Sequence, residues 1–231
     1  MWKKVQVSLL VTLSALSAQS FARSSQAPQL LRPGIFHSNE VSAKTGDTWL
    51  GLFRTRHGYK LVNTRLIVTP PKNQLTDKNH EGYGCIVAVQ QKVRPLFMVR
   101  NLPQLRPGPV PTVAAMKVLA FGAPVRLRLG PKVYTLDASK YVRKNKAVDY
   151  KIVLQCAKVS QTLVVRNNCD LGPQSYLPLL WAGDIDGDGK LDLLIDTTDS
   201  YNGWDPTLFL SRGAKSNQLV QLGPSFKQNG I

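Results

Sequence analysis

The most regular periodicity in the chain lies in residues 148–156, VDYKIVLQC. Apolar side chains recur there at every second position: Val148, Tyr150, Ile152, Leu154 and Cys156. Side chains on a β-strand point alternately to opposite faces, so this pattern predicts a strand with one buried and one solvated face. Residues 158–165 are the expected hairpin partner of this strand.

The same period of two extends to both sides of this hairpin. Further strands are expected at residues 61–68, 84–89, 96–99, 116–121, 125–129, 132–136, 177–181 and 191–195. The 15 prolines and 17 glycines fall mostly between these runs, where they indicate turns. No window of eleven or more residues after position 22 carries a helical stripe. The sequence therefore predicts an all-β fold, either a β-sandwich or an open barrel of short antiparallel strands.

The first 22 residues have the features of a signal peptide. Lys3 and Lys4 precede an apolar run over residues 5–16, and small residues lead to Ala22. The run is too short and too often interrupted by polar residues to cross a bilayer. We therefore expect cleavage after Ala22, a periplasmic or secreted protein, and no transmembrane segment in the mature chain.

Composition suggests three segments after the signal peptide (1–22). Residues 23–47 are expected to be a flexible mature N-terminus, and residues 48–172 to form a basic β-rich domain. Residues 173–231 form a C-terminal segment. Because this last segment is short for an independent core, it either folds alone or shares the sheet of the preceding domain.

Charge is distributed unevenly along the chain. The formal net charge is +16, yet seven of the fourteen acidic residues lie between positions 184 and 205. The only basic residue in that interval is Lys190. The average composition does not explain why the charge becomes negative in this interval, so we expect the carboxylates to have a specific role.

The acidic interval contains the spacing of a calcium loop, with aspartates at loop positions 1, 3, 5 and 9 and glycine at position 6. The predicted metal ligands are the side chains of Asp184, Asp186, Asp188 and Asp192 and the main-chain carbonyl of Lys190. Calcium needs six to eight oxygens converging from a short segment, whereas magnesium retains several waters. A nearly all-protein cage therefore favours calcium. The alternative is an aspartate-rich turn held by side-chain to backbone bonds, without an ion.

The loop is not a helix–loop–helix calcium hand, since Ile195 stands at position 12 and the flanking residues 177–181 and 191–195 have strand patterns. With its D-x-D-x-D-G-x-x-D spacing, it resembles the FG-GAP/VCBS-type repeats of integrin-α-like proteins, over residues 177–212. This resemblance implies a calcium-loop β-hairpin with the ligands named above. The run over residues 49–66 resembles exported bacterial β-proteins that end in one such loop. A single repeat does not make a propeller.

The three cysteines would meet an oxidising compartment after export. Three cysteines allow any one of three disulfide pairings. The favoured one is the nearest pair in sequence, Cys156 with Cys169, which would join the two ends of the expected hairpin. The alternative is that Cys85 and these two residues remain small, buried thiols.

No catalytic or cofactor-binding motif is present beyond the calcium loop, and the three histidines lie apart. We expect an exported, non-enzymatic calcium-binding protein that acts as an envelope or extracellular binding or structural module. The alternative is a secreted hydrolase whose site is assembled only by the fold.

Basic residues give the only indication of a partner. Arg126 and Arg128 share one face of an expected strand, and a second basic group follows in the next loop: Lys140, Arg143, Lys144 and Lys146. Candidate partners are an anionic envelope polymer, lipid head groups or a protein, whereas nucleic acid is not expected. The alternative is a solvated strand face with a solubilising loop.

Overall fold

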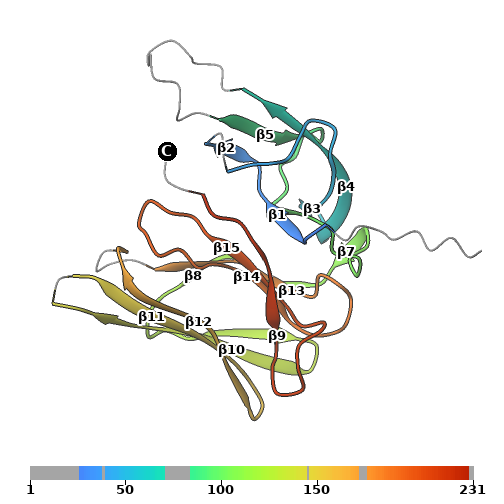
Figure 1. Ribbon diagram of the computed structural model, residues 1–231. Helices are drawn as coiled ribbons and strands as arrows, with labels where there is room; N and C mark the ends of the chain where they lie inside the picture. Colours follow the sequence, from blue (N-terminus) through green and yellow to red (C-terminus); the bar gives the residue numbers. More distant parts are fainter. Residues whose placement is uncertain (1–25, 38–39, 71–83, 145, 172–175, 229–231) are drawn as a thin grey trace, which may run out of the picture.

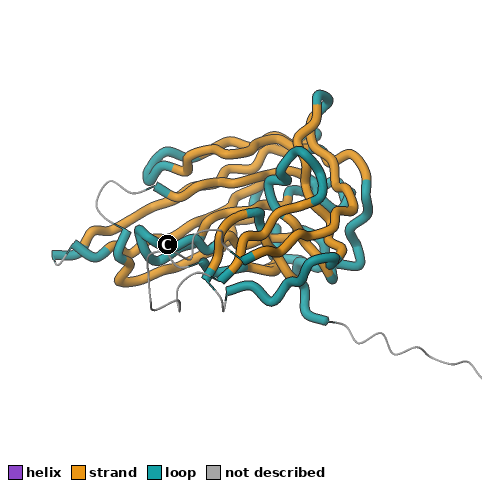
Figure 2. Tube along the Cα trace, turned by 90° about the horizontal axis from the view of Figure 1, so that it is seen from above, coloured by secondary structure: helices purple, strands orange, loops and turns teal. Residues whose placement is uncertain are grey.

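The computed structural model describes residues 26–37, 40–70, 84–144, 146–171 and 176–228. Within this part of the chain every regular element is a β-strand, and the named strands pair only in antiparallel fashion. Figure 2 shows the described trace as strands and loops throughout. The predicted all-β class is confirmed. Because the described residues form no helix, none of them provides a helix able to cross a bilayer.

A four-stranded sheet contains the hairpin on which the fold class was predicted. Its strands are β9 (Val125–Leu129), β10 (Lys132–Val142), β11 (Val148–Cys156) and β12 (Val159–Cys169), in the order β12-β11-β10-β9. Alternate residues of β11, from Val148 to Leu154, are buried, while Lys151 and Gln155 are exposed. One face of this sheet is therefore dry and the other is wet, as the alternation predicts.

A five-stranded sheet includes the C-terminal strands. It contains β8 (Thr112–Leu119), β13 (Leu177–Gly183), β14 (Asp192–Asp196), β15 (Pro206–Leu210) and β16 (Gln221–Ser225), in the order β16-β15-β14-β13-β8. Every residue of β14 and β15 is buried. Strand β8 comes from the predicted N-terminal domain and pairs with β13, so the C-terminal segment shares its sheet with an earlier strand.

A curved seven-stranded sheet is built from the N-terminal half. Its strands are β1 (Gln29–Leu31), β2 (Gly34–Phe36), β3 (Thr48–Thr55), β4 (Gly58–Thr69), β5 (Cys85–Val89), β6 (Met98–Arg100) and β7 (Gly108–Val110). Part of the predicted flexible segment 23–47 thus forms strands, because β1 pairs with β6 and β2 with β5. The predicted signal peptide, residues 1–22, lies outside the described residues.

The three sheets form layers, with the five-stranded sheet between the other two (Figure 1). Leu193 and Ile195 of β14 belong to the core shared with the four-stranded sheet, whereas Leu194 belongs to the core shared with the seven-stranded sheet. A strand buried on both faces has no solvated side, which explains the almost continuous apolar runs of β14 and β15. Asp192 and Asp196, at the two ends of β14, are the charged exceptions.

The favoured Cys156–Cys169 disulfide is wrong, since all three cysteines are free. The β11–β12 hairpin pairs Cys156 with Val159 beside its turn and Cys169 with Val148 at its open end. Val148 and Cys156 are eight residues apart on β11, so the two cysteines lie roughly 26 Å from each other. A disulfide requires Cα atoms within about 7 Å.

Candidate metal centre

The aspartate loop joins the two central strands β13 and β14. The last pair before the loop is Gly183 opposite Asp192, so residues 184–191 close an antiparallel hairpin. Gly187 and Gly189 have φ angles of 72° and 75°, in the left-handed region that glycine adopts without strain. The glycine at loop position 6 is therefore required by the backbone conformation and not merely tolerated.

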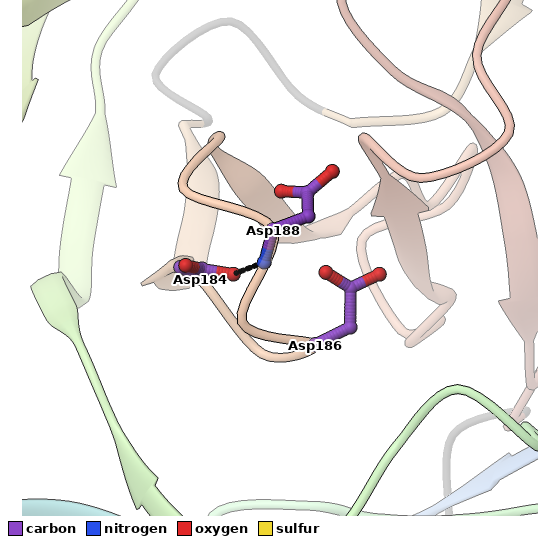
Figure 3. Close-up of side chains that lie close together, drawn as sticks. All are labelled: Asp184, Asp186 and Asp188. Atoms are coloured by element: carbon purple, nitrogen blue, oxygen red, sulfur yellow. Dashed lines mark hydrogen bonds between the residues drawn. The ribbon is translucent and has the colours of Figure 1, made fainter.

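Three of the predicted ligands lie together. One carboxylate oxygen from each of Asp184, Asp186 and Asp188 lies within 4.8 Å of the others (Figure 3). The three residues alternate along the same short loop between β13 and β14. Three carboxylates this close repel one another unless a cation or protons compensate their charge.

Asp184 organises the loop backbone around the cluster. Its Oδ1 accepts hydrogen bonds from the amides of Gly187 (2.8 Å) and Asp188 (3.0 Å), and its Oδ2 accepts one from Gly189 (2.9 Å). Asp184 is only 6% exposed. A carboxylate has about four lone-pair sites, so these three bonds leave capacity for one further ligand.

Asp186 has one oxygen that the protein leaves unsatisfied. Its side chain is 0% exposed, and its Oδ2 accepts a hydrogen bond from Arg212 Nε at 3.0 Å. Its Oδ1 is buried without a hydrogen-bond partner among the described residues. Burial, followed by repulsion from Asp188, raises the pKa of Asp186. A buried anionic oxygen without a donor is unstable, so this atom favours a cation beside it.

Asp192 holds the loop to the end of β15. Its Oδ1 accepts hydrogen bonds from the amide (2.7 Å) and the hydroxyl (2.9 Å) of Ser211, and its Oδ2 accepts one from the Ile185 amide (2.8 Å). The Ser211 hydroxyl also lies 3.0 Å from Asp188 Oδ1. Because a hydroxyl has one proton, it cannot satisfy both carboxylates. Burial raises the pKa of Asp192 to about 7 despite these bonds.

The described cluster brings together three of the five predicted ligands. Asp192 is outside the group of oxygens within 4.8 Å, and both of its oxygens contact Ile185 or Ser211. Direct ligation by Asp192 and by the carbonyl of Lys190 stays a prediction. The Lys190 ammonium lies 4.0 Å from Asp188, at the edge of the cluster.

Sequence reasoning missed Ser211 and Arg212. Both follow β15, and they contact Asp192 and Asp186 across 19 and 26 positions of sequence, respectively. No spacing rule connects them to the aspartates, because the pairing of β14 with β15 brings them there. A polar pair directly after a buried apolar strand was the one available signal.

The basic residues form two separate groups. On β9, Arg126 and Arg128 are exposed and pair with the first half of β10, near the β9–β10 turn. The second group lies at the opposite end of β10, where Arg143 forms an ion pair with Asp149 at 2.7 Å. Lys140 belongs to β10 instead of the expected loop, and it covers the Phe121 ring at 4.8 Å. Binding of an anionic polymer stays a prediction.

No family model matches the chain, and neither the curated proteins nor the solved structures compared with it contain a match. The resemblance to FG-GAP loops therefore depends on the residues of the loop alone.

Proposed function

We propose that this chain is an exported, non-enzymatic calcium-binding β-protein of the envelope or extracellular space, with an FG-GAP-like loop. In this proposal the ion holds the β13–β14 loop and the residues after β15 in one arrangement. The protein then serves as a binding or structural module stabilised by calcium. The observation that supports it most is the buried, unpartnered Oδ1 of Asp186 beside Asp184 and Asp188.

Calcium suits the loop for two physical reasons. Carboxylate and carbonyl oxygens on a short segment match its need for six to eight hard ligands at about 2.3–2.6 Å. A dication also removes the repulsion among the aspartates, which links ion binding to folding of the loop. Because Arg212 already neutralises part of the charge at Asp186, we expect the weak affinity of extracellular modules, with a Kd of roughly 0.1–1 mM.

Calorimetric titration of the mature chain, residues 23–231, with calcium and with magnesium after chelator treatment tests the proposal. With a Kd of about 0.1 mM, calcium at about 10 mM adds roughly 2.7 kcal/mol to the free energy of unfolding. For a chain of this size the melting temperature then rises by roughly 5–11 °C. Asp186→Asn abolishes the shift, whereas Asp199→Asn, at an exposed ion pair with Lys227, preserves it.

A wild-type chain that gives no heat with calcium and no change in melting temperature refutes the proposal. Equal responses to magnesium and calcium refute the choice of ion.

A further inference from the structure

A small apolar cavity lies between the seven-stranded and the five-stranded sheets. Its volume is about 90 Å³, and its wall includes Leu30 of β1, Phe97, and Leu180 and Leu194 of the central hairpin. All four side chains are buried. For comparison, an apolar protein cavity of about 150 Å³ holds a benzene molecule. This cavity therefore has room for a few carbon atoms.

One side of the cavity is formed by a cation stacked on an aromatic ring. The guanidinium carbon of Arg32 lies 4.3 Å from the centre of the Trp204 ring, and both residues line the cavity. The Arg32 Nη2 donates a hydrogen bond to Gln228 Oε1 at 3.2 Å. Gln228 is fixed in turn by two backbone hydrogen bonds with Trp204, of 2.9 and 2.8 Å. Gln228 therefore holds the stacked pair of Arg32 and Trp204 together.

Two hydrogen-bond donors of this pair have no acceptor. Arg32 Nε and Trp204 Nε1 are both buried, and neither has a hydrogen-bond partner among the described residues. A buried N–H without an acceptor is costly, and the large majority of such groups in proteins are satisfied. Since both unsatisfied groups are donors, a ligand that complements them must supply acceptor oxygens.

The charge balance favours an anionic acceptor. Asp196 is the acidic residue that acts on Arg32, and yet burial outweighs its attraction and lowers the pKa of Arg32. Asp196 is itself engaged, since its Oδ1 accepts hydrogen bonds from the amides of Thr198 (3.1 Å) and Asp205 (2.9 Å). Apart from Arg32, the residues lining the cavity are not ionisable. The lining provides neither a nucleophile nor a base, so it is suited to binding and not to catalysis.

The cavity has a strained residue at its wall. Met116 in β8 has a φ angle of 51°, which is uncommon for a residue with a side chain, and it is 63% exposed. It also lines the cavity, so it marks the side that faces solvent. Strained backbone of this kind is concentrated at ligand sites.

We propose that this cavity binds a small aliphatic monocarboxylate. The carboxylate accepts hydrogen bonds from Arg32 and Trp204, and the first few carbons of the chain occupy the apolar cavity beside Leu180 and Leu194. The remainder of the chain passes Met116 toward solvent. This ligand supplies both features that the cavity lacks, an acceptor for two buried donors and apolar contact for its walls.

Titration of the mature chain with hexanoate, hexanol and hexylamine, with calcium held constant, tests the carboxylate directly on the wild-type protein. A ligand of eight heavy atoms that has to displace the Arg32 and Trp204 side chains slightly to reach their donors is expected to bind with a Kd of roughly 1 mM. Hexanol should bind at least about tenfold more weakly, because it lacks the charge. Hexylamine should show no saturable binding.

The variant Arg32→Met keeps an unbranched stem against Trp204 and removes the donors. It should lower hexanoate affinity about tenfold or more and leave hexanol affinity unchanged. Arg54→Met, at an exposed arginine of β3, is the matched control and should change neither. Hexanoate binding no tighter than hexanol binding, or hexanoate binding that Arg32→Met leaves intact, overturns the proposal. The wild-type series decides alone if the variant does not fold.

Discussion

Asp196 is a buried carboxyl whose removal should stabilise the protein at neutral pH. It is 2% exposed at the end of β14, and burial raises its pKa from 3.8 to about 6. A carboxyl with a raised pKa in the folded state stays protonated there after the unfolded chain has ionised. Its contribution to stability is therefore complete below about pH 4 and is lost as pH rises through about 6.

The difference between the two pKa values corresponds to roughly 3 kcal/mol in the free energy of unfolding. Asp196→Asn keeps an acceptor oxygen for the amides of Thr198 and Asp205 and removes the ionisation. The variant also takes a counter-charge from Arg32, which reduces the gain. We expect the variant to be more stable than wild type by about 2 kcal/mol at pH 7.5, and equal to it at about pH 4.

Urea unfolding of residues 23–231 at both pH values, with calcium constant, measures this difference. The titration of Asp192 and of other carboxyls occurs in both proteins and cancels in the comparison. A variant that is less stable than wild type at pH 7.5 refutes the reasoning, because Asp196 would then act as a stabilising partner of Arg32. A difference that does not depend on pH refutes it equally.

Two further substitutions test the packing of the layers. Tyr150→Phe removes a buried hydroxyl that lies 2.8 and 2.9 Å from two backbone carbonyls just after β14. It should lower the free energy of unfolding, measured in urea, by about 1–2 kcal/mol. Tyr141→Phe, at an exposed ring, should leave the free energy of unfolding unchanged. Gly183→Ala places a Cβ 2.2 Å from the Pro111 carbonyl oxygen and should lower the free energy of unfolding by about 3 kcal/mol or more. Its control is Gly122→Ala, in open space at a φ of 76°, which should lower the free energy of unfolding by about 1 kcal/mol. Equal costs within either pair contradict the packing described here.

Local patterns in the sequence predicted several elements closely. The expected strand over residues 125–129 coincides with β9, and that over residues 148–156 coincides with β11. Where the prediction stopped short, strand pairing extended the element. The strand expected at residues 132–136 continues to Val142, because β11 pairs with β10 along its whole length. The strand expected at residues 158–165 is β12, which continues to Cys169 because it pairs with β11 up to that residue.

Part of the candidate site could likewise be predicted from the sequence, and part of it could not. The spacing of Asp184, Asp186 and Asp188 predicted their proximity, because residues two apart in a tight loop meet without help from the rest of the fold. The contacts of Ser211 and Arg212 with the aspartates could not be predicted from residue spacing, since strand pairing brings these two residues to the loop. The same limit applies to the cysteines, whose spacing suggested a disulfide that the β11–β12 register prevents.

Side-chain alternation, turn residues and the aspartate loop are properties of short segments, so the amino-acid order alone determined the all-β class and the position of the acidic cluster. The order of the sheets in space depends on contacts between segments that are far apart in the sequence. Only the tertiary structure placed β14 and β15 in the middle layer, and only it brought Arg32 to Trp204. Burial creates the unsatisfied donors and carboxylates of these sites, and burial is decided when distant strands pack together.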